Sequence, residues 1–236
     1  MTLAPLPLSL FGSGEVGVVE QPVFKRHQLD PCCWVDTVAG FITGADALFV
    51  EVQNRFDWFR GDRLMYGNWH REPRLTATLE LDDALAPQVV RQAAELLGAH
   101  YGREFGGLFC NYYQQGSDSV AWHADRVGRT TVDPLVAIIS LGGPRTFAMR
   151  DVTRTADASR WVMHSGDLLI MGGATQHHWE HAIAKVADAP PRISLTTRAG
   201  WNPAENLDRR HRQTRRPLHK SSGRPGPSES SPATEV

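Results

Sequence analysis

The stretch SVAWHADRVG contains two side chains that could bind a metal ion. His123 and Asp125 are two residues apart, so on a β-strand they point to the same face. One imidazole and one carboxylate form half of a metal site, or only the polar side of a strand. The richest source of a further ligand is ATQHHWEHAI, which contains His177, His178 and His181. Two histidines and one carboxylate, with coordination positions left open, suit non-haem Fe(II) in oxygen chemistry.

The segment RISLTTR contains two arginines that alternation places on one face of a strand. That face carries Arg192, Ser194, Thr196 and Arg198. Arginines that point into a β structure need anionic partners, because a buried and unpaired charge is costly. Their backbones are roughly 20 Å apart on a straight strand, which leaves room for a small dicarboxylate between the two guanidinium groups. The planar fork of arginine binds a carboxylate through two hydrogen bonds, although a structural salt bridge would also explain either arginine.

Beyond Gly102, short β segments must position these side chains. Clusters of Gly, Ser, Asp and Pro divide the segments, as in QQGSD, LGGP, HSGD and MGGAT. The eight predicted strands span residues 108–113, 119–125, 135–140, 145–150, 160–164, 167–171, 178–183 and 192–198. So many short strands within about a hundred residues are typical of a sandwich or jelly roll.

Two helices are predicted upstream of the strands. Residues 43–59 open with a capping pattern from Thr43 to Asp46 and place four apolar residues on one helical face. These four are Leu48, Val52, Phe56 and Phe59. The second helix spans residues 87–97, with Pro87 at an early position and Gly98 as the expected stop. The fold class is therefore mostly β with flanking helices (α+β).

The 236-residue composition, 41% hydrophobic and 22% charged, is ordinary for a globular protein. The first basic side chain is Lys25, and the longest apolar runs are far shorter than a membrane span. We therefore expect a cytoplasmic protein that has no signal peptide and no membrane association. The cysteines Cys32, Cys33 and Cys110 are odd in number and lack the paired spacing of a zinc site. They are predicted to be reduced and to act as small buried hydrophobic residues.

Charge and composition divide the chain into three regions. We predict an N-terminal region (1–100) with helices and a substrate-recognition lid, a β core (101–203) and a disordered tail (204–236). The tail is first basic and then rich in Ser and Pro. From Asn206 to Val236 there are seven Lys/Arg and three Asp/Glu, whereas the preceding residues carry a net charge of −5. The tail arginines could contact phosphates, or could simply be solvated.

Five phrases, taken in their order and spacing, closely resemble the AlkB family of Fe(II)- and 2-oxoglutarate-dependent dioxygenases. These phrases are NYY, WHAD, PLVAIISLGGPRTFAMR, GDLLIMGGATQHHWEH and PRISLTTR. The similarity covers residues 109–198, and EPRLTA at residues 72–77 extends it upstream. The resemblance implies a double-stranded β-helix (jelly roll, cupin-like) core. It implies that His123, Asp125 and His181 bind iron. His181 is preferred because it ends the phrase GATQxxWxH, whereas His177 and His178 are expected at the surface or near the ligands.

The same resemblance implies the binding residues for the cosubstrate 2-oxoglutarate. These are Arg192 and Arg198, with polar contacts from Asn111 and Tyr113. The implied cofactors are Fe(II), 2-oxoglutarate and O2, and no protein nucleophile is needed. The implied reaction is oxidative demethylation of N-alkylated bases in DNA or RNA, of the 1-methyladenine or 3-methylcytosine type. Its products are formaldehyde, succinate and CO2.

Two alternatives stay open at this point. One is a 2-oxoglutarate dioxygenase that hydroxylates or demethylates a protein, lipid or small molecule. The other is a catalytically silent module that binds nucleic acid. The first alternative is motivated by two departures from the family pattern. Arg126, Val127 and Gly128 stand where family members carry an acidic pair, and TLEL (residues 78–81) stands where they carry an aromatic pair.

A nucleic acid substrate would need stacking and phosphate contacts. The segment RFDWFRGDRLMYGNWHR alternates arginines with aromatic residues, although an amphipathic segment that covers the β core would look similar. We predict substrate contacts from Trp58, Tyr66 and Trp69, and a phosphate contact from Arg150. Phe59 is a further stacking candidate. We expect a monomer.

Overall fold

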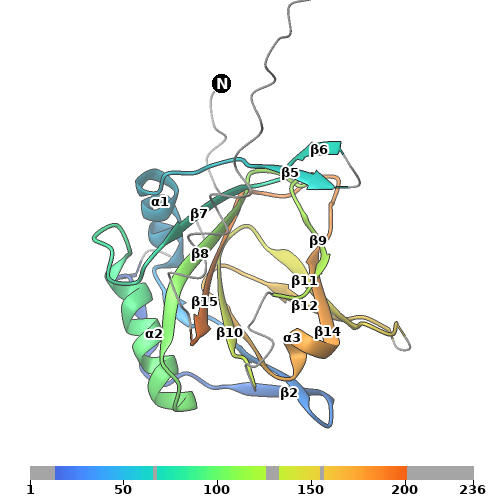
Figure 1. The fold of residues 1–236 in the computed structure, drawn as a ribbon. Helices are drawn as coiled ribbons and strands as arrows, with labels where there is room; N and C mark the ends of the chain where they lie inside the picture. The colour runs from blue at the N-terminus through green and yellow to red at the C-terminus, as the bar shows by residue number, and fades with distance from the viewer. Residues whose placement is uncertain (1–13, 66–67, 126–132, 155–156, 201–236) are drawn as a thin grey trace, which may run out of the picture.

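The computed structural model describes residues 14–65, 68–125, 133–154 and 157–200, in which two antiparallel sheets face each other. The seven-stranded sheet has the order β2 (Lys25–Asp30), β3 (Cys33–Val38), β13 (Leu168–Gly173), β10 (Val136–Gly142), β15 (Arg192–Ala199), β8 (Phe105–Tyr113), β7 (Leu75–Leu79). The four-stranded sheet has the order β12 (Ser159–Met163), β11 (Arg145–Asp151), β14 (Trp179–Ile183), β9 (Val120–His123). Figure 1 shows the two facing sheets.

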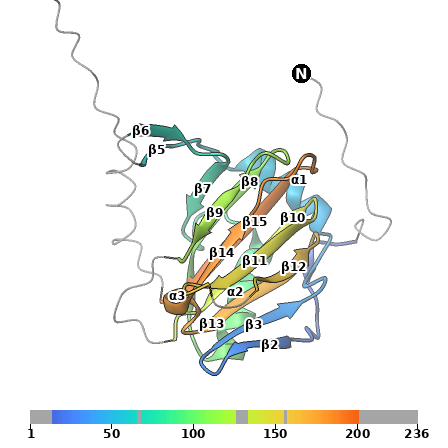
Figure 2. The same ribbon diagram turned by 90° about the vertical axis from the view of Figure 1, so that its right-hand side faces the viewer.

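From β8 to β15 the chain crosses between the two sheets at every step except β11 to β12, which are neighbours in the smaller sheet; this arrangement is typical of a jelly roll. The predicted fold class is confirmed, and each of the eight predicted strands overlaps an observed strand. The larger sheet also contains β2, β3 and β7 from the first hundred residues, so residues on both sides of position 100 build one sheet. Two short antiparallel pairs complete the described strands: β1 (Gly17–Val18) with β4 (Ile42–Thr43), and β5 (Asp62–Met65) with β6 (Asn68–Arg71). Figure 2 shows the β5–β6 pair projecting beyond the sheets.

Helices α1 (Ala45–Arg55) and α2 (Gln88–Tyr101) cover the outer face of the larger sheet (Figure 1). Their apolar faces form one core with that sheet, and a second core fills the space between the two sheets. Strand β15 contributes to the helix-side core through Ile193 and Leu195. Its alternate residues therefore face the other sheet, where the candidate site lies. The short helix α3 (Thr175–His178) leads directly into β14.

Both predicted helices exist, but three details of their ends were wrong. Helix α1 ends at Arg55, because Phe56 already has an extended backbone. Phe59 therefore lies beyond the helix, where it is 52% exposed and forms a β-bridge with Thr76. Its N-cap is Gly44 in the left-handed region, without a side-chain cap.

Helix α2 does not stop at Gly98 but continues to Tyr101. Gly102 ends it with φ +64° and donates its N–H to the Gly98 carbonyl. An isolated glycine costs a helix about 1 kcal/mol, which the burial of neighbouring apolar residues such as Leu97 offsets.

The cysteine prediction holds for two residues and fails for the third. Cys33 and Cys110 are fully buried, but Cys32 is exposed in the turn between β2 and β3. Burial there is prevented because a two-residue turn at the end of a hairpin faces solvent. In the described part of the chain, no helix combines the length and apolar character of a membrane span.

Candidate active site

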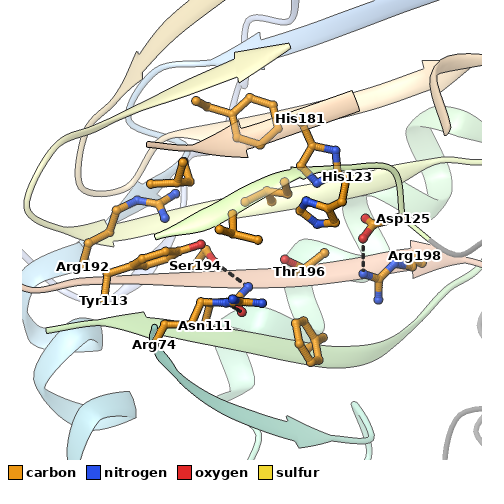
Figure 3. A pocket seen from close by; sticks show the side chains of 15 residues that line it. Arg74, Asn111, Tyr113, His123, Asp125, His181, Arg192, Ser194, Thr196 and Arg198 are labelled. Atoms are coloured by element: carbon orange, nitrogen blue, oxygen red, sulfur yellow. Dashed lines mark hydrogen bonds and ion pairs between the residues drawn. The ribbon is translucent and has the colours of Figure 1, made fainter. Parts of the chain in front are cut away.

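Three potential metal ligands meet on the inner face of the four-stranded sheet. His123 ends β9 and is paired directly with His181 on the neighbouring strand β14. Their ring centroids are 4.2 Å apart. Asp125 follows two residues after His123, and the ligand atoms of all three residues lie within 4.8 Å of one another. We call these residues the His–Asp–His triad, and Figure 3 shows them pointing into one pocket.

Hydrogen bonds orient two members of the triad, His123 and Asp125. His123 donates its Nδ1–H to the carbonyl of Ala121 at 2.8 Å, which leaves Nε2 for a metal. The backbone N–H of Asp125 donates to Gln176 Oε1 at 2.8 Å. Arg198 Nη2 donates to Asp125 Oδ1 at 3.0 Å. The oriented ring and carboxylate need little rearrangement to bind an ion.

The electrostatics keep His181 and Asp125 in the protonation states that a metal requires. Burial, which outweighs the nearby carboxylate of Asp125, lowers the pKa of His181 to about 3. Burial alone would raise the pKa of Asp125, but Arg198 and the two histidines hold it at about 2. At neutral pH the site therefore offers a neutral imidazole at His181 beside an ionised carboxylate, which are the forms that bind metal.

Arg192 stands at the opposite end of the pocket from Arg198 and is 1% exposed. Its Nε donates to Ser140 Oγ at 2.9 Å, and its guanidinium carbon lies 5.3 Å from the centre of the Tyr113 ring. The buried Nη1 has no hydrogen-bond partner among the described residues. Burial also lowers the pKa of Arg192. A buried cationic donor of this kind fits a carboxylate ligand, since only an anion would offset its desolvation.

One wall of the pocket comes from β7 and β8. Asn111 Nδ2 donates to Ser194 Oγ at 3.4 Å, and Asn111 Oδ1 accepts from Arg74 Nε at 2.6 Å. Tyr113, 2% exposed, lies next to Arg192. Arg74 was not assigned to the site by the sequence analysis, although it belongs to the phrase EPRLTA that extended the family resemblance. It lines the pocket because Thr76 pairs with Asn111 across the β7–β8 ladder.

The pocket is small, with a cavity volume of about 50 Å³. Its polar lining includes all seven residues predicted to bind iron or 2-oxoglutarate: Asn111, Tyr113, His123, Asp125, His181, Arg192 and Arg198. Its apolar lining consists of Phe109, Val120, Ile138, Phe147 and Ile183. Two imidazoles and one carboxylate with open positions suit Fe(II), and Arg192 suits a carboxylate of a bound acid.

A family model described as "2OG-Fe(II) oxygenase superfamily" matches residues 67–198. The chain belongs to this superfamily. The match includes the seven predicted iron and 2-oxoglutarate residues. It therefore covers the pocket as well as most of the two sheets.

Relatives confirm the resemblance to the AlkB family. The human "Alpha-ketoglutarate-dependent dioxygenase alkB homolog 3" is 32% identical over 175 residues, 65% of this chain and 61% of the relative. The mouse "DNA oxidative demethylase ALKBH2" is 26% identical over 208 residues, 78% of this chain and 87% of the relative. The chain thus spans about three fifths of the alkB homolog 3 sequence. A solved structure titled "The structure of OsALKBH1" shares the fold, with a TM-score of 0.51 and 17% identity over 74% of this chain and 100% of that one.

Trp58, Trp69 and Arg150, the described residues predicted to contact substrate, do not line this pocket. Trp58 donates to the Gln53 carbonyl at 3.0 Å and packs against the core residue Tyr112. Trp69 is 37% exposed on the β5–β6 hairpin. Arg150 pairs with Glu180 at 2.8 Å and covers the Trp122 ring.

Strand alternation puts Arg150 on the outer face of the small sheet, since its neighbour Met149 is paired with His181. Tyr66, the predicted tail (204–236) and the departure at 126–128 lie outside the described residues. The substrate roles of Trp58, Tyr66, Trp69 and Arg150 stay predictions.

Proposed function

We propose that this protein is an Fe(II)- and 2-oxoglutarate-dependent dioxygenase that oxidatively demethylates N-alkylated bases in DNA or RNA. The observation that carries the proposal is one pocket that joins the His–Asp–His triad to the buried guanidinium of Arg192. The superfamily match supports the cofactors. The names of the relatives, an alkB homolog dioxygenase and a DNA oxidative demethylase, support the substrate class.

Each pocket residue has a task in this reaction. The triad would hold Fe(II), which together with 2-oxoglutarate and O2 supplies the oxidising power, with succinate, CO2 and formaldehyde as products. Arg192 would bind a carboxylate of 2-oxoglutarate. Arg198 keeps Asp125 ionised and oriented through their 3.0 Å hydrogen bond. The apolar side chains of Ile138 and Ile183 would limit the access of water to the reacting groups.

Residues outside the pocket would select the base. Trp69, exposed on the projecting β5–β6 pair, would stack on nucleic acid (Figure 2 shows the pair). A cytoplasmic monomer is part of the same proposal. Its three free cysteines suit a reducing compartment.

The first experiment tests the metal and the cosubstrate. Purified protein with Fe(II), 2-oxoglutarate and O2 should form succinate. The variants His123→Ala and Asp125→Ala should lose this activity, whereas His177→Ala, which changes an exposed histidine outside the triad, should keep it. Equal succinate formation by wild type and both triad variants would refute the metal assignment.

The second experiment tests the substrate. Oligonucleotides of DNA and RNA that carry 1-methyladenine or 3-methylcytosine should stimulate succinate formation and release formaldehyde. If succinate forms but no methylated oligonucleotide stimulates it, the substrate is a protein, lipid or small molecule. Binding of oligonucleotides without any succinate would instead indicate a silent binding module.

A further inference from the structure

A second group of potential metal ligands lies apart from the His–Asp–His triad. Asp30 ends β2, Cys32 is in the following turn, Cys33 begins β3, and His178 is the last residue of α3. Their ligand atoms all lie within 4.8 Å of one another. We call these four residues the thiolate cluster. It joins three residues of one hairpin to a histidine 145 positions further along the chain.

The sulfur–sulfur and sulfur–nitrogen distances within the cluster match the edges of a tetrahedral zinc site. With Zn–S bonds of about 2.3 Å and Zn–N bonds of about 2.05 Å, a tetrahedron has S···S edges of about 3.8 Å and S···N edges of about 3.6 Å. The two sulfur atoms of Cys32 and Cys33 are 3.8 Å apart. His178 Nδ1 lies 3.6 Å from Cys32 Sγ and 3.9 Å from Cys33 Sγ. Asp30 Oδ1 lies 3.2 Å from Cys32 Sγ.

The surroundings fix the ligands in these positions. The carbonyl of Cys32 accepts a hydrogen bond from Ala174 N at 2.9 Å. The close contact between the Cys32 carbonyl and the start of α3 requires a glycine at position 173. At Gly173 φ is +66°, and a Cβ would lie 2.0 Å from the same carbonyl oxygen. The second carboxylate oxygen of Asp30 accepts from Trp179 Nε1 at 2.7 Å. Metal-binding carboxylates are characteristically held by such an outer hydrogen bond.

We propose that the thiolate cluster binds one Zn²⁺ ion in a closed, four-coordinate structural site. Two thiolates, one imidazole and one carboxylate complete a tetrahedron, and thiolate ligands favour Zn²⁺ over the harder divalent cations. The partial exposure of Cys32 and His178 gives the ion a path to the site. This site is separate in residues and in donor chemistry from the iron site proposed above.

The bound ion would join the two sheets of the fold. Three of its ligands belong to the β2–β3 hairpin of the larger sheet, and the fourth immediately precedes β14 of the smaller sheet. His178 is three residues before the triad member His181. Zinc would therefore fix the start of the strand that positions an iron ligand.

The test must separate this site from the triad, which can itself bind zinc or cobalt. The double variant His123→Ala/Asp125→Ala removes two triad ligands and leaves the thiolate cluster unchanged. Expressed with zinc and passed over a weak chelating resin, this protein should retain about one zinc per chain, measured by mass spectrometry of the metals. Replacement of the zinc by Co²⁺ should give two kinds of absorption band. One is an intense charge-transfer band near the ultraviolet, which requires thiolate ligands, and the others are the visible bands of tetrahedral cobalt.

Single substitutions in the same background assign the ligands. His178→Gln and Cys32→Ser, both at exposed positions, should each lose most of the retained zinc and weaken the thiolate band. His177→Gln is the matched control, because it changes the adjacent exposed histidine on α3 outside the cluster, and it should retain zinc. Trp179→Phe should keep the ligands but weaken zinc affinity about 10- to 100-fold, through loss of the hydrogen bond to Asp30.

Three results would overturn the proposal. The first is a folded double variant that neither retains zinc nor develops the thiolate band with Co²⁺. The second is equal zinc retention by His178→Gln and His177→Gln. The third is a disulfide between Cys32 and Cys33 in protein purified under reducing conditions, seen as two missing thiols and a mass lower by two hydrogens. None of these readouts depends on dioxygenase activity.

Discussion

The substitution Arg192→Met should weaken the binding of 2-oxoglutarate but should not lower the stability of the ligand-free protein. Arg192 is 1% exposed, and its Nη1 lacks a hydrogen-bond partner among the described residues. Each hydrogen bond from a charged group to a carboxylate contributes about 1.5 to 3 kcal/mol. Loss of two such bonds to 2-oxoglutarate removes at least about 3 kcal/mol, which corresponds to a roughly 100-fold higher KM. The ligand-free protein, however, should lose no stability.

The reason lies in the desolvation of the guanidinium. A buried charge without an anionic partner is costly, and an apolar side chain of similar volume is often neutral or more stable by about 1 to 4 kcal/mol. Urea unfolding of the metal-free and ligand-free protein measures this effect. A titration of 2-oxoglutarate, followed by succinate formation and by the ligand-induced rise in melting temperature, measures the binding.

Arg145 provides a matched control for this experiment. It is 3% exposed, and its guanidinium carbon lies 5.6 Å from the centre of the same Tyr113 ring. Its Nη2 donates to the carbonyls of Asp118 and Ala184, and it does not line the pocket. Arg145→Met should therefore destabilise the protein by about 3 kcal/mol and leave the KM for 2-oxoglutarate unchanged. If Arg192→Met destabilises the protein as much as Arg145→Met does and leaves the KM unchanged, then Arg192 has a structural role only and the reasoning is refuted.

Three further changes test other parts of the structure. Arg198→Met should raise the pKa of Asp125 and weaken Fe(II) binding about 10- to 100-fold, measured by metal titration under nitrogen. The metal-free protein should lose about 2 kcal/mol between pH 6.5 and 5, because unfolded His181 takes up a proton that the folded protein excludes until about pH 3. Urea unfolding at both pH values checks this slope, which His181→Leu should reduce. Gly173→Ala should cost about 2 kcal/mol or more, because φ is +66° and the new Cβ would meet the Cys32 carbonyl. Unchanged thermal stability in this variant would contradict the close packing of the β2–β3 turn against α3.

Local patterns in the sequence were sufficient to predict much of the pocket. A period of two placed His123 and Asp125 on one face, and the same period placed Arg192 and Arg198 on one face of β15. All four side chains line one pocket, although β9 ends at His123 and Asp125 lies two residues beyond the strand. Such predictions succeed because strand alternation depends only on neighbouring residues.

Contacts that depend on strand register were not predictable in this way. Arg74 reaches Asn111 only because β7 and β8 pair with Thr76 opposite Asn111. Cys33 approaches His178 because β3 pairs with β13 and brings Cys33 opposite Gly173, immediately before α3. A single sequence contains no local signal for either register. The spacing of the cysteines alone therefore did not indicate a zinc site, although three residues of the thiolate cluster lie within one four-residue stretch.

The segment from Gln176 to His181 links the two candidate metal sites. Gln176 holds the backbone of Asp125, and His181 belongs to the triad, whereas His178 belongs to the thiolate cluster. Two sites so close in sequence could compete for the same ion, but their donors differ. The triad offers only nitrogen and oxygen and leaves positions open, whereas the cluster adds two sulfurs and closes the tetrahedron. Open coordination is needed where a cosubstrate and O2 must bind, and closed coordination suits a structural ion. The same short segment would therefore contribute His181 to an iron site for chemistry and His178 to a zinc site for stability, because the two sites differ in their donors and in their open positions.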